Sequence, residues 1–278
     1  MSFDRRLTLI HEDVAARGLE GLVPARRYVD PAALQVSAPA APLRRHPADE
    51  AEQESRLLFG ERFDVLLEQD GYSFGQAARD GYVGWVPAEA LSGPPILPTH
   101  RVTALRTYAF SQANIKTTPV GLYSLNALVT IEATEGRFAR AARAGWFVAE
   151  HLAPIGTGFE TDPAGVALRF LGAPYLWGGR ESLGLDCSGL VQQALNACGV
   201  ACPRDTDMQA AMGSAIEAAE LTRGDLVFWK GHVGMMLDEA RLVHANGHHM
   251  ATVVEPLAEA IARIDAAGAG QPTAYRRP

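Results

Sequence analysis

Cysteine is scarce in this sequence, and long apolar runs are missing from it. There are three cysteines in 278 residues, an odd and low number that argues against a disulfide framework. No apolar run approaches the ~18 residues that a membrane-spanning helix needs. The apolar run near the N-terminus is broken at once by His11, Glu12 and Asp13, so it is too short for the core of a signal peptide. These absences favour a reducing compartment, and we expect a cytoplasmic protein.

Excess positive charge is also missing. The chain has 25 Lys and Arg against 32 Asp and Glu, a formal net charge of −7, and its basic residues do not cluster. Nucleic acids and anionic membranes are therefore not expected as partners, because both are bound through dense positive charge. With 47% hydrophobic and 21% charged residues, the composition is that of an ordinary globular protein. The length predicts two or three domains.

The first half of the chain is rich in expected strands. Residues 1–33 form a lead-in, and after it come many short apolar stretches separated by Gly, Pro, Asn and Asp. The clearest strand candidates are 57–59, 63–67, 81–86 and 127–131. Short strands at this spacing are typical of small antiparallel β-barrels.

This β-rich region contains an internal repeat. Two pairs of segments carry it: Phe74–Arg79 with Phe138–Arg143, and Gly84–Leu91 with Gly145–Leu152. The repeat predicts two copies of one small β unit, at 34–93 and 99–155, joined by a stiff Pro-rich linker. The strand that ends in Gly-Trp in each copy resembles bacterial SH3-like domains.

The C-terminal part, residues 158–278, differs in kind because helical patterns come first and strands follow, which predicts an α+β domain. The apolar residues of its plainest helix share one face: Leu190, Val191, Ala194, Leu195 and Cys198. Gly199 stands where this helix should end. Strands are expected at 225–229, 232–237, 241–245 and 252–254.

Cys187 lies in the first turn of this expected helix. There the unpaired backbone N–H groups and the positive end of the helix dipole favour a thiolate. Gly178, Gly179 and Gly184 precede it, and they let the backbone approach closely and leave room for a substrate. The other interpretation of Cys187, as a small residue packed under a loop, stays open on these grounds.

A thiolate nucleophile needs a base, and the base needs a group that orients it. His232 begins one expected strand and His244 ends the next, and a tight turn would join the two strands into an antiparallel hairpin. If Met236 pairs with Ala240, then 232 pairs with 244, and a register shift of two leaves the histidines as diagonal neighbours on one face. We therefore expect His232 to accept the Cys187 proton while His244 fixes its tautomer.

Four segments follow one another along the C-terminal part: Tyr175–Gly179, Asp186–Leu190, His232–Met235 and Leu242–Ala245. Together they resemble the NlpC-type cysteine peptidases of bacterial cell-wall metabolism, in family order and at plausible spacing. The resemblance covers the chain from about residue 158 to its end. It implies a papain-like domain, without a metal or other cofactor, that cleaves amide bonds next to D-glutamate in peptidoglycan stem peptides.

The same resemblance implies roles for four residues. Cys187 is the nucleophile, His232 the general base and acid, and His244 the orienting third residue. Tyr175 matches the family tyrosine that donates a hydrogen bond near the oxyanion, and the backbone N–H of Cys187 would be the other donor. Tyr175 can also be read as a packing aromatic residue.

Two SH3-like units ahead of such a domain are similar to γ-D-glutamyl-L-diamino acid endopeptidases that act on recycled stem peptides. In that subgroup the first SH3-like unit helps to wall off the site, which admits substrates with a free N-terminal L-alanine. The resemblance places seven residues in the substrate pocket: Glu61, Tyr82, Trp177, Asp186, Ser188, Asp205 and Thr206. The carboxylates of Glu61 and Asp205 would bind the ammonium; otherwise Glu61 is an exposed strand charge and Asp205 a helix cap.

Four other interpretations stay open. Cys198, Cys202, His248 and His249 are metal-ligand types, although a zinc site needs four well-placed ligands and the two cysteines can equally be buried thiols. A wall-binding protein with an inert C-terminal domain would be marked by a lost Cys or His, and neither is lost. The remaining two are an exported hydrolase of intact cell wall and an acyltransferase on the same scaffold.

Overall fold

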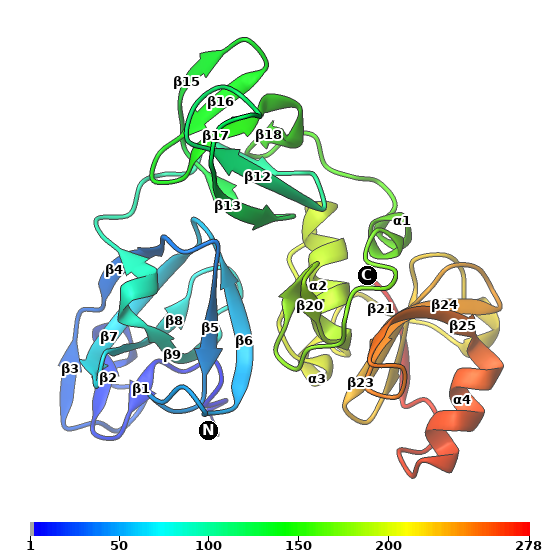
Figure 1. Cartoon of the computed structure of the whole chain (residues 1–278). Helices are drawn as coiled ribbons and strands as arrows, with labels where there is room; N and C mark the ends of the chain where they lie inside the picture. Colours follow the sequence, from blue (N-terminus) through cyan, green and yellow to red (C-terminus); the bar gives the residue numbers. More distant parts are fainter. Residues whose placement is uncertain (1–2) are drawn as a thin grey trace. The chain divides into compact units, whose positions relative to one another are not determined.

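The computed structural model describes residues 3–278; Met1 and Ser2, which belong to the expected lead-in, lie outside the described residues. The chain divides into two compact units, residues 1–157 and 158–278 (Figure 1). The first unit is built from short β-strands, and the second contains the α-helices. The expected combination of small β-barrels with an α+β domain is confirmed.

The lead-in is itself folded and belongs to the first barrel. It forms a three-stranded sheet of β1 (Ile10–His11), β2 (Val14–Ala16) and β3 (Arg27–Val29), with a short 3₁₀ helix at Arg17–Leu19. Leu9, with Val14 and Val29 beside it, packs against the buried aromatic residues Phe74 and Trp85 of the barrel. This packing was not anticipated, because the first 33 residues have no clear strand periodicity.

The first barrel is a seven-stranded sheet in the order β10-β4-β7-β8-β9-β5-β6. Its strands are β4 (Ala32–Val36), β5 (Ala40–Arg44), β6 (Gln53–Leu58), β7 (Arg62–Gln69), β8 (Tyr72–Ala77), β9 (Val83–Pro87) and β10 (Leu91–Ser92), with a 3₁₀ turn at Ala88–Ala90. Asp70 and Gly71 both have positive φ, 50° and 81°, and join β7 to β8 in a tight hairpin. Trp85 of the Gly-Trp motif is 2% exposed at the centre of this barrel.

The second barrel is built from strands in two sheets. One sheet holds β14 (Leu128–Val129), β11 (His100–Val102) and β18 (Leu152–Pro154). The other holds β13 (Pro119–Ser124), β12 (Arg106–Phe110), β17 (Gly145–Val148), β16 (Phe138–Ala141) and β15 (Ile131–Glu135), and Ala149–His151 forms a 3₁₀ turn. The two repeated segments form matching strand pairs, β8 with β9 and β16 with β17.

Residues of both barrels share one hydrophobic cluster, so the linker is not their only connection. Leu58 and Phe59 of the first barrel pack with Tyr123 and Phe147 of the second. The backbone N–H of Leu128 donates to the carbonyl of Phe59 at 2.8 Å. The two barrels therefore behave as one packed unit.

The second unit has one six-stranded sheet, in the order β21-β26-β22-β23-β24-β25, together with a small hairpin. Its strands are β19 (Arg180–Glu181), β20 (Gly184–Leu185), β21 (Ser214–Ala215), β22 (Leu226–Trp229), β23 (His232–Met236), β24 (Arg241–Asn246), β25 (Ala251–Pro256) and β26 (Ala274–Arg277). Its helices are α1 (Pro163–Leu168), α2 (Cys187–Ala197), α3 (Thr206–Gln209) and α4 (Leu257–Ala266), with a 3₁₀ turn at Ala218–Glu220.

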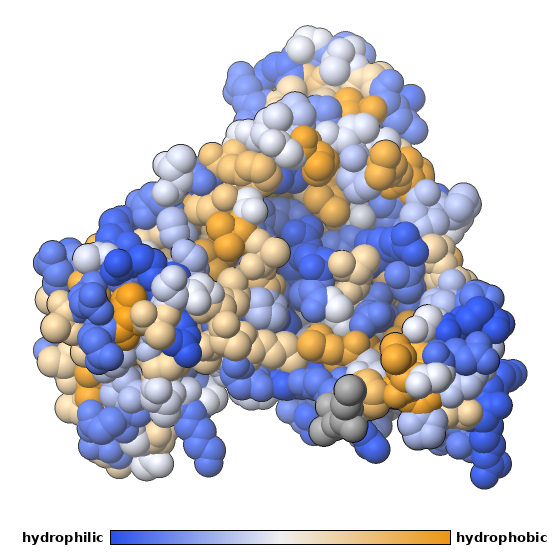
Figure 2. All heavy atoms as spheres, turned by 180° about the vertical axis from the view of Figure 1, so that it is seen from behind, coloured by the Kyte–Doolittle hydropathy of each residue, from blue (hydrophilic) through white to orange (hydrophobic). Residues whose placement is uncertain are grey.

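The expected helix and the four expected strands of this unit are confirmed, whereas α4 and β26 were not predicted. Gly199 follows the helix end with φ +78°, as a helix stop requires. Ala260 and Ile264 of α4 pack against Met236 and Leu242 on one face of the sheet. Among the described residues no helix is long and apolar enough to cross a bilayer, and Figure 2 shows hydrophilic residues interspersed with apolar ones over the face in view.

Candidate active site

Cys187 is the first residue of α2, and its neighbours hold the start of this helix in place. Asp186 is the N-cap and accepts the N–H of Gly189 at 2.7 Å and the N–H of Gly178 at 2.9 Å. The backbone N–H groups of Cys187 and Ser188 have no acceptor within the helix, as at any α-helix start. They are thus available to stabilise negative charge near the sulfur.

The glycines around Cys187 allow the chain to pack closely there, as expected. A Cβ on Gly189 would lie 2.2 Å from the carbonyl oxygen of Gly179. A Cβ on Gly179 would lie 2.4 Å from the carbonyl oxygen of Gly184. Both distances are far inside van der Waals contact, so the hairpin of β19 and β20 can lie against the start of α2 only if these residues are glycine.

Arg204 supports Asp186 and was missed by the sequence reasoning. Its side chain is 1% exposed; its Nη2 lies 2.6 Å from Oδ2 of Asp186, and its Nη1 donates to Oγ of Ser188 at 2.7 Å. The Ser188 hydroxyl in turn donates to Asp186 at 3.2 Å. Asp186 and Ser188 therefore have clear structural partners, and their expected contact with substrate stays a prediction. The only signal for Arg204 was its place one residue before Asp205.

His232 and His244 are diagonal neighbours on adjacent strands. β23 and β24 pair with Met236 opposite Leu242, a register two residues away from the expected pairing of Met236 with Ala240. That pairing is wrong, but the shift of two keeps both imidazoles on one face. Nε2 of His232 lies 2.9 Å from Nδ1 of His244, so the expected hydrogen bond between the histidines is confirmed.

The far side of His244 meets two more polar groups that the sequence reasoning missed. Its Nε2 lies 2.7 Å from a carboxylate oxygen of Glu255 on β25 and 3.0 Å from Nδ2 of Asn246. Glu255 also forms an ion pair with Arg263 of α4. The signal for Glu255 was a charged residue at the end of the apolar strand that pairs with β24.

Burial decides how Cys187 and His232 ionise. It raises the pKa of Cys187 to about 12, helped by the charge of Asp186 and opposed by the backbone N–H groups of Val233 and Ser188. Burial also lowers the pKa of His232 to about 3. Neither charge is stable alone, so the two form together, when the thiol proton passes to the imidazole.

Tyr175 lies beside Cys187. Burial raises the pKa of its phenol, and the nearby Cys187 and Asp186 shift that pKa in the same direction. The hydroxyl therefore remains protonated at neutral pH and can donate a hydrogen bond. A buried thiol with an oriented imidazole and protonated donors nearby is the arrangement that acyl transfer through a thioester requires.

The other expected pocket residues of this unit differ in exposure. Trp177 is 58% exposed, unusual for so large an apolar side chain. Asp205 is the half-buried N-cap residue of α3, and Thr206 is the first residue of that helix. The capping alternative for Asp205 therefore fits its position, although its side chain makes no capping hydrogen bond. The substrate contacts of all three stay predictions.

Two family models match this chain. Residues 172–264 match the NlpC/P60 family, and residues 43–91 match the bacterial dipeptidyl-peptidase SH3 domain. The gamma-D-glutamyl-L-lysine dipeptidyl-peptidase of Bacillus subtilis (strain 168) is 31% identical over 212 residues, which are 69% of this chain and 72% of that protein. This chain belongs to the NlpC/P60 family. It is a cysteine peptidase that acts on peptidoglycan peptides.

Two further relatives show how far the likeness extends. A gamma-D-glutamyl-L-lysine dipeptidyl-peptidase of Bacillus cereus (strain ATCC 10987 / NRS 248) is 33% identical over 96 residues, 32% of this chain and 29% of that protein. A solved NlpC/P60 family structure from Bacillus cereus ATCC 10987 matches with a TM-score of 0.74 over 88% of this chain and 99% of that chain, at 19% identity. The second likeness concerns the fold alone.

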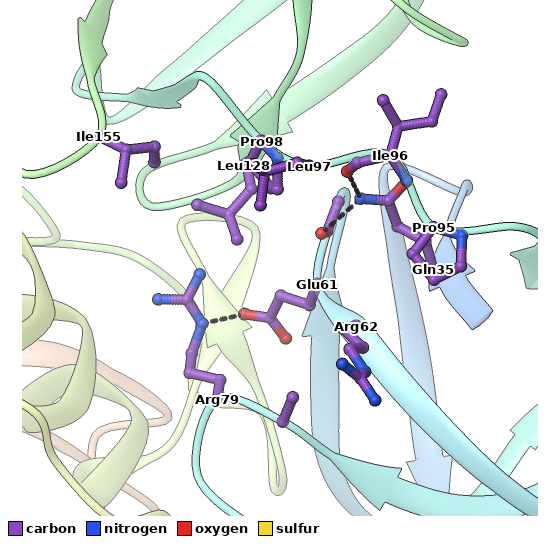
Figure 3. Close-up of a pocket in the computed structure, with 12 residues that line it drawn as sticks. Gln35, Glu61, Arg62, Arg79, Pro95, Ile96, Leu97, Pro98, Leu128 and Ile155 are labelled. Carbon is purple, nitrogen blue, oxygen red and sulfur yellow. Dashed lines mark hydrogen bonds and ion pairs between the residues drawn. The ribbon is translucent and has the colours of Figure 1, made fainter. Parts of the chain in front are cut away.

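The two expected substrate residues of the first barrel, Glu61 and Tyr82, are both buried, at 1% and 4% exposure. Glu61 lies between β6 and β7 in a cavity of about 570 Å³, and Figure 3 shows its carboxylate turned toward Arg79, with which it forms an ion pair. Leu128 and Ile155 contribute apolar walls to the same cavity. Glu61 is therefore not the exposed strand charge of the alternative interpretation, and its role toward substrate stays a prediction.

The zinc alternative has no site in the part of the chain that the structure describes. There, no three His, Cys, Asp or Glu side chains are placed to hold a metal ion. Cys198 and Cys202 are not joined in a disulfide, and Cys202 is buried. His249 uses its Nδ1 for a 3.0 Å hydrogen bond with Oδ1 of Asn246. The interpretation of these cysteines as packed thiols agrees with this arrangement.

Proposed function

We propose that this NlpC/P60 peptidase hydrolyses the γ-D-glutamyl-L-diamino acid bond of stem peptides that carry a free N-terminal L-alanine, and that it serves murein recycling in the cytoplasm. One observation carries the proposal: the Bacillus subtilis relative named gamma-D-glutamyl-L-lysine dipeptidyl-peptidase is similar over 69% of this chain. A match of that length cannot be confined to the peptidase unit, which is 121 residues long (278 − 157). A dipeptidyl-peptidase releases two residues from a free N-terminus, here L-Ala-γ-D-Glu.

The proposed reaction uses Cys187 at the start of α2, His232 at the start of β23, and Tyr175. His232 takes the thiol proton, and the Cys187 sulfur attacks the γ-carbonyl carbon of D-glutamate. The oxyanion is stabilised by the backbone N–H of Cys187 and the Tyr175 hydroxyl. His232 then gives its proton to the amine of the diamino acid, which leaves, and a thioester remains. Water, deprotonated by His232, hydrolyses the thioester and regenerates the thiol.

Glu61 gives the proposal its specificity for a free amine. The ammonium of L-alanine would compete with Arg79 for the buried carboxylate of Glu61. Because Arg79 remains available to Glu61 when the ammonium is absent, the contact is worth the low end of the range for buried charge-assisted contacts, about 2 kcal/mol or about 30-fold in kcat/KM. Acetylation of the amine removes the charge and adds bulk, so it should cost about this factor.

The test is mass spectrometry of the products from L-Ala-γ-D-Glu-L-Lys, its meso-diaminopimelate analogue and the N-acetylated form of each. The free peptides should be cut between D-Glu and the diamino acid, and the acetylated ones should survive. Glu61→Gln should slow cleavage of the free peptide and reduce the discrimination, whereas Glu68→Gln, an exposed acidic residue on β7, should do neither. Equal cleavage of free and acetylated peptides would refute the specificity.

An exported hydrolase of intact cell wall is the competing assignment. The stem peptides of intact cell wall are joined to glycan and have no free N-terminus. We therefore expect purified sacculi to stay nearly uncut. Fractionation of the native host should place the protein with the cytoplasmic markers. Rapid release of peptides from sacculi, or recovery of the protein outside the cytoplasm, would favour the exported enzyme and leave the peptidase chemistry untouched.

A further inference from the structure

The side chains of His232, His244 and Glu255 lie on a diagonal across a sheet. Each comes from one of three adjacent strands, β23, β24 and β25 (orange in Figure 1). His244 pairs directly with Val253, and Glu255 lies two residues further along the same face of β25. On β23, the neighbouring strand on the other side, His232 likewise lies two residues away from the position directly opposite His244. The contacts along this diagonal are 2.9 Å between the histidines and 2.7 Å from His244 to Glu255.

This diagonal determines where the ring protons lie. Glu255 forms an ion pair with Arg263, and a carboxylate in an ion pair can only accept a hydrogen bond. The adjacent Nε2 of His244 must then carry the proton, which leaves Nδ1 of His244 as an acceptor. Nε2 of His232 donates to that acceptor, and Nδ1 of His232 is left without a proton. Because Nε2 of His232 is engaged by His244, Nδ1 is the ring nitrogen of His232 that remains to act as a base.

Asn246 favours the opposite placement of the ring protons on His244 and His232. Its Oδ1 accepts the backbone N–H of His249 at 2.8 Å, so its Nδ2 is the atom 3.0 Å from Nε2 of His244. If Nδ2 donated to Nε2, His244 would carry its proton on Nδ1 and His232 would carry its proton on the nitrogen required as base. A carboxylate 2.7 Å from an unprotonated ring nitrogen is repulsive, and it outweighs one neutral hydrogen bond.

We propose that Glu255 is a positioning residue of this active site, which accepts the Nε2–H of His244 and thereby sets the tautomers of both histidines so that His232 can act as the base. Glu255 acts through His244 and does not touch substrate. Its side chain is 12% exposed and that of His244 is 0% exposed, so water cannot easily take over this role. Arg263 from α4 holds the carboxylate in place through their ion pair.

The first test is kinetic and uses the full chain with the free tripeptide of the proposed function as substrate. Glu255→Ala should lower kcat by about 10- to 100-fold, as loss of a partner that orients a histidine does elsewhere, and leave KM within about two-fold. Glu255→Gln should restore most of kcat, because its amide oxygen still accepts from Nε2. Glu259→Ala, an exposed carboxylate on α4, is the matched control and should be unchanged.

The second test reads the tautomers without any turnover. In ¹⁵N NMR of the full chain with labelled histidine, the wild-type protein should show His244 protonated on Nε2 and His232 protonated on Nε2. Glu255→Ala should move His244 toward the Nδ1–H form, and Asn246→Ala should not. The proposal rests on the peptidase function for its kinetic test only; an inactive wild type would refute the substrate, whereas a wild-type His244 protonated on Nδ1, or an unchanged kcat in Glu255→Ala, would refute the role of Glu255.

Discussion

Gly234 stands directly across from His244 in the hairpin of β23 and β24. A Cβ at position 234 would lie 3.5 Å from Cβ of His244 and 2.2 Å from Cδ1 of Leu242. The missing side chain leaves the space in which the imidazoles of His232 and His244 meet at 2.9 Å. The catalytic diagonal therefore depends on a glycine that has no chemistry of its own.

Gly234→Ala should displace Leu242 and destabilise the C-terminal unit by about 1–3 kcal/mol, the usual result of an overpacked core. It should also lower kcat, because the two imidazoles lose their alignment. Gly247→Ala is the control, since a Cβ there meets nothing within 4 Å. Thermal unfolding and steady-state kinetics check both effects, and a Gly234→Ala protein as stable and active as the wild type would contradict this account.

The reactivity of Cys187 should depend on His232. Burial raises the pKa of Cys187 to about 12, so without a proton acceptor the thiol should stay neutral at pH 7. His232→Gln should slow alkylation of Cys187 by iodoacetamide at least ~10-fold and abolish turnover, as Cys187→Ala should. The half-buried Cys198 serves as internal control, because its labelling should not change. Peptide mapping measures both rates, and fast labelling of Cys187 in the variant would show a thiolate independent of His232.

Acid should destabilise the C-terminal unit through His244. Burial lowers the pKa of His244 to about 3, below its ordinary value near 6.5. Between pH 6.5 and pH 3, His244 is therefore protonated in the unfolded chain but not in the folded protein. The contribution of neutral His244 to the free energy of unfolding is present in full above pH 6.5 and is lost as the pH falls. From pH 7 to pH 5 the loss is about 2 kcal/mol.

His244→Gln should reduce that loss, and His248→Gln, which removes an exposed histidine, should not. The comparison depends on the change with pH, so a general destabilisation by either substitution does not affect it. Hydrogen exchange of the β23 and β24 amides at pH 5 and pH 7 measures the unfolding free energy of this unit. Equal pH dependence in His244→Gln and the wild type would show that His244 is not held neutral by the fold.

Arg204→Met should be strongly destabilising, because it leaves the buried carboxylate of Asp186 without its counter-charge. The expected cost is about 3–5 kcal/mol, and the double variant Asp186→Asn with Arg204→Met should recover part of it. Arg241→Met removes an exposed ion pair with Asp238 and should cost about 1 kcal/mol or less. Thermal melts of the wild type and the three variants test this order of stability. The order would be wrong if Arg204→Met and Arg241→Met had the same melting temperature.

Much of the site could be predicted from the sequence because its signals are local. Cys187 stands at the start of an amphipathic helix, and the apolar spacing that shows the helix also shows its first turn. The pairing of two consecutive strands brings His232 and His244 together in either of two registers, so the neighbours were correct although the register was not. The repeat that ends in Trp85 and Trp146 likewise needs no knowledge of the tertiary fold.

The remaining features depend on contacts between residues far apart in the chain. Arg204 supports Asp186 from 18 residues away, and Glu255 reaches His244 only because β25 pairs with β24 in one register. Glu61 is paired directly with Arg79 in the lining of a cavity, whereas its sequence context is that of an exposed strand charge. Periodicity and motif spacing report the order of elements along the chain and carry no information on which buried charge meets which. The sequence thus determined the predicted nucleophile, its predicted base and the repeated β units, and the tertiary packing decided which partners hold them, because a buried charge is tolerated only where the fold brings its counter-charge within hydrogen-bond distance.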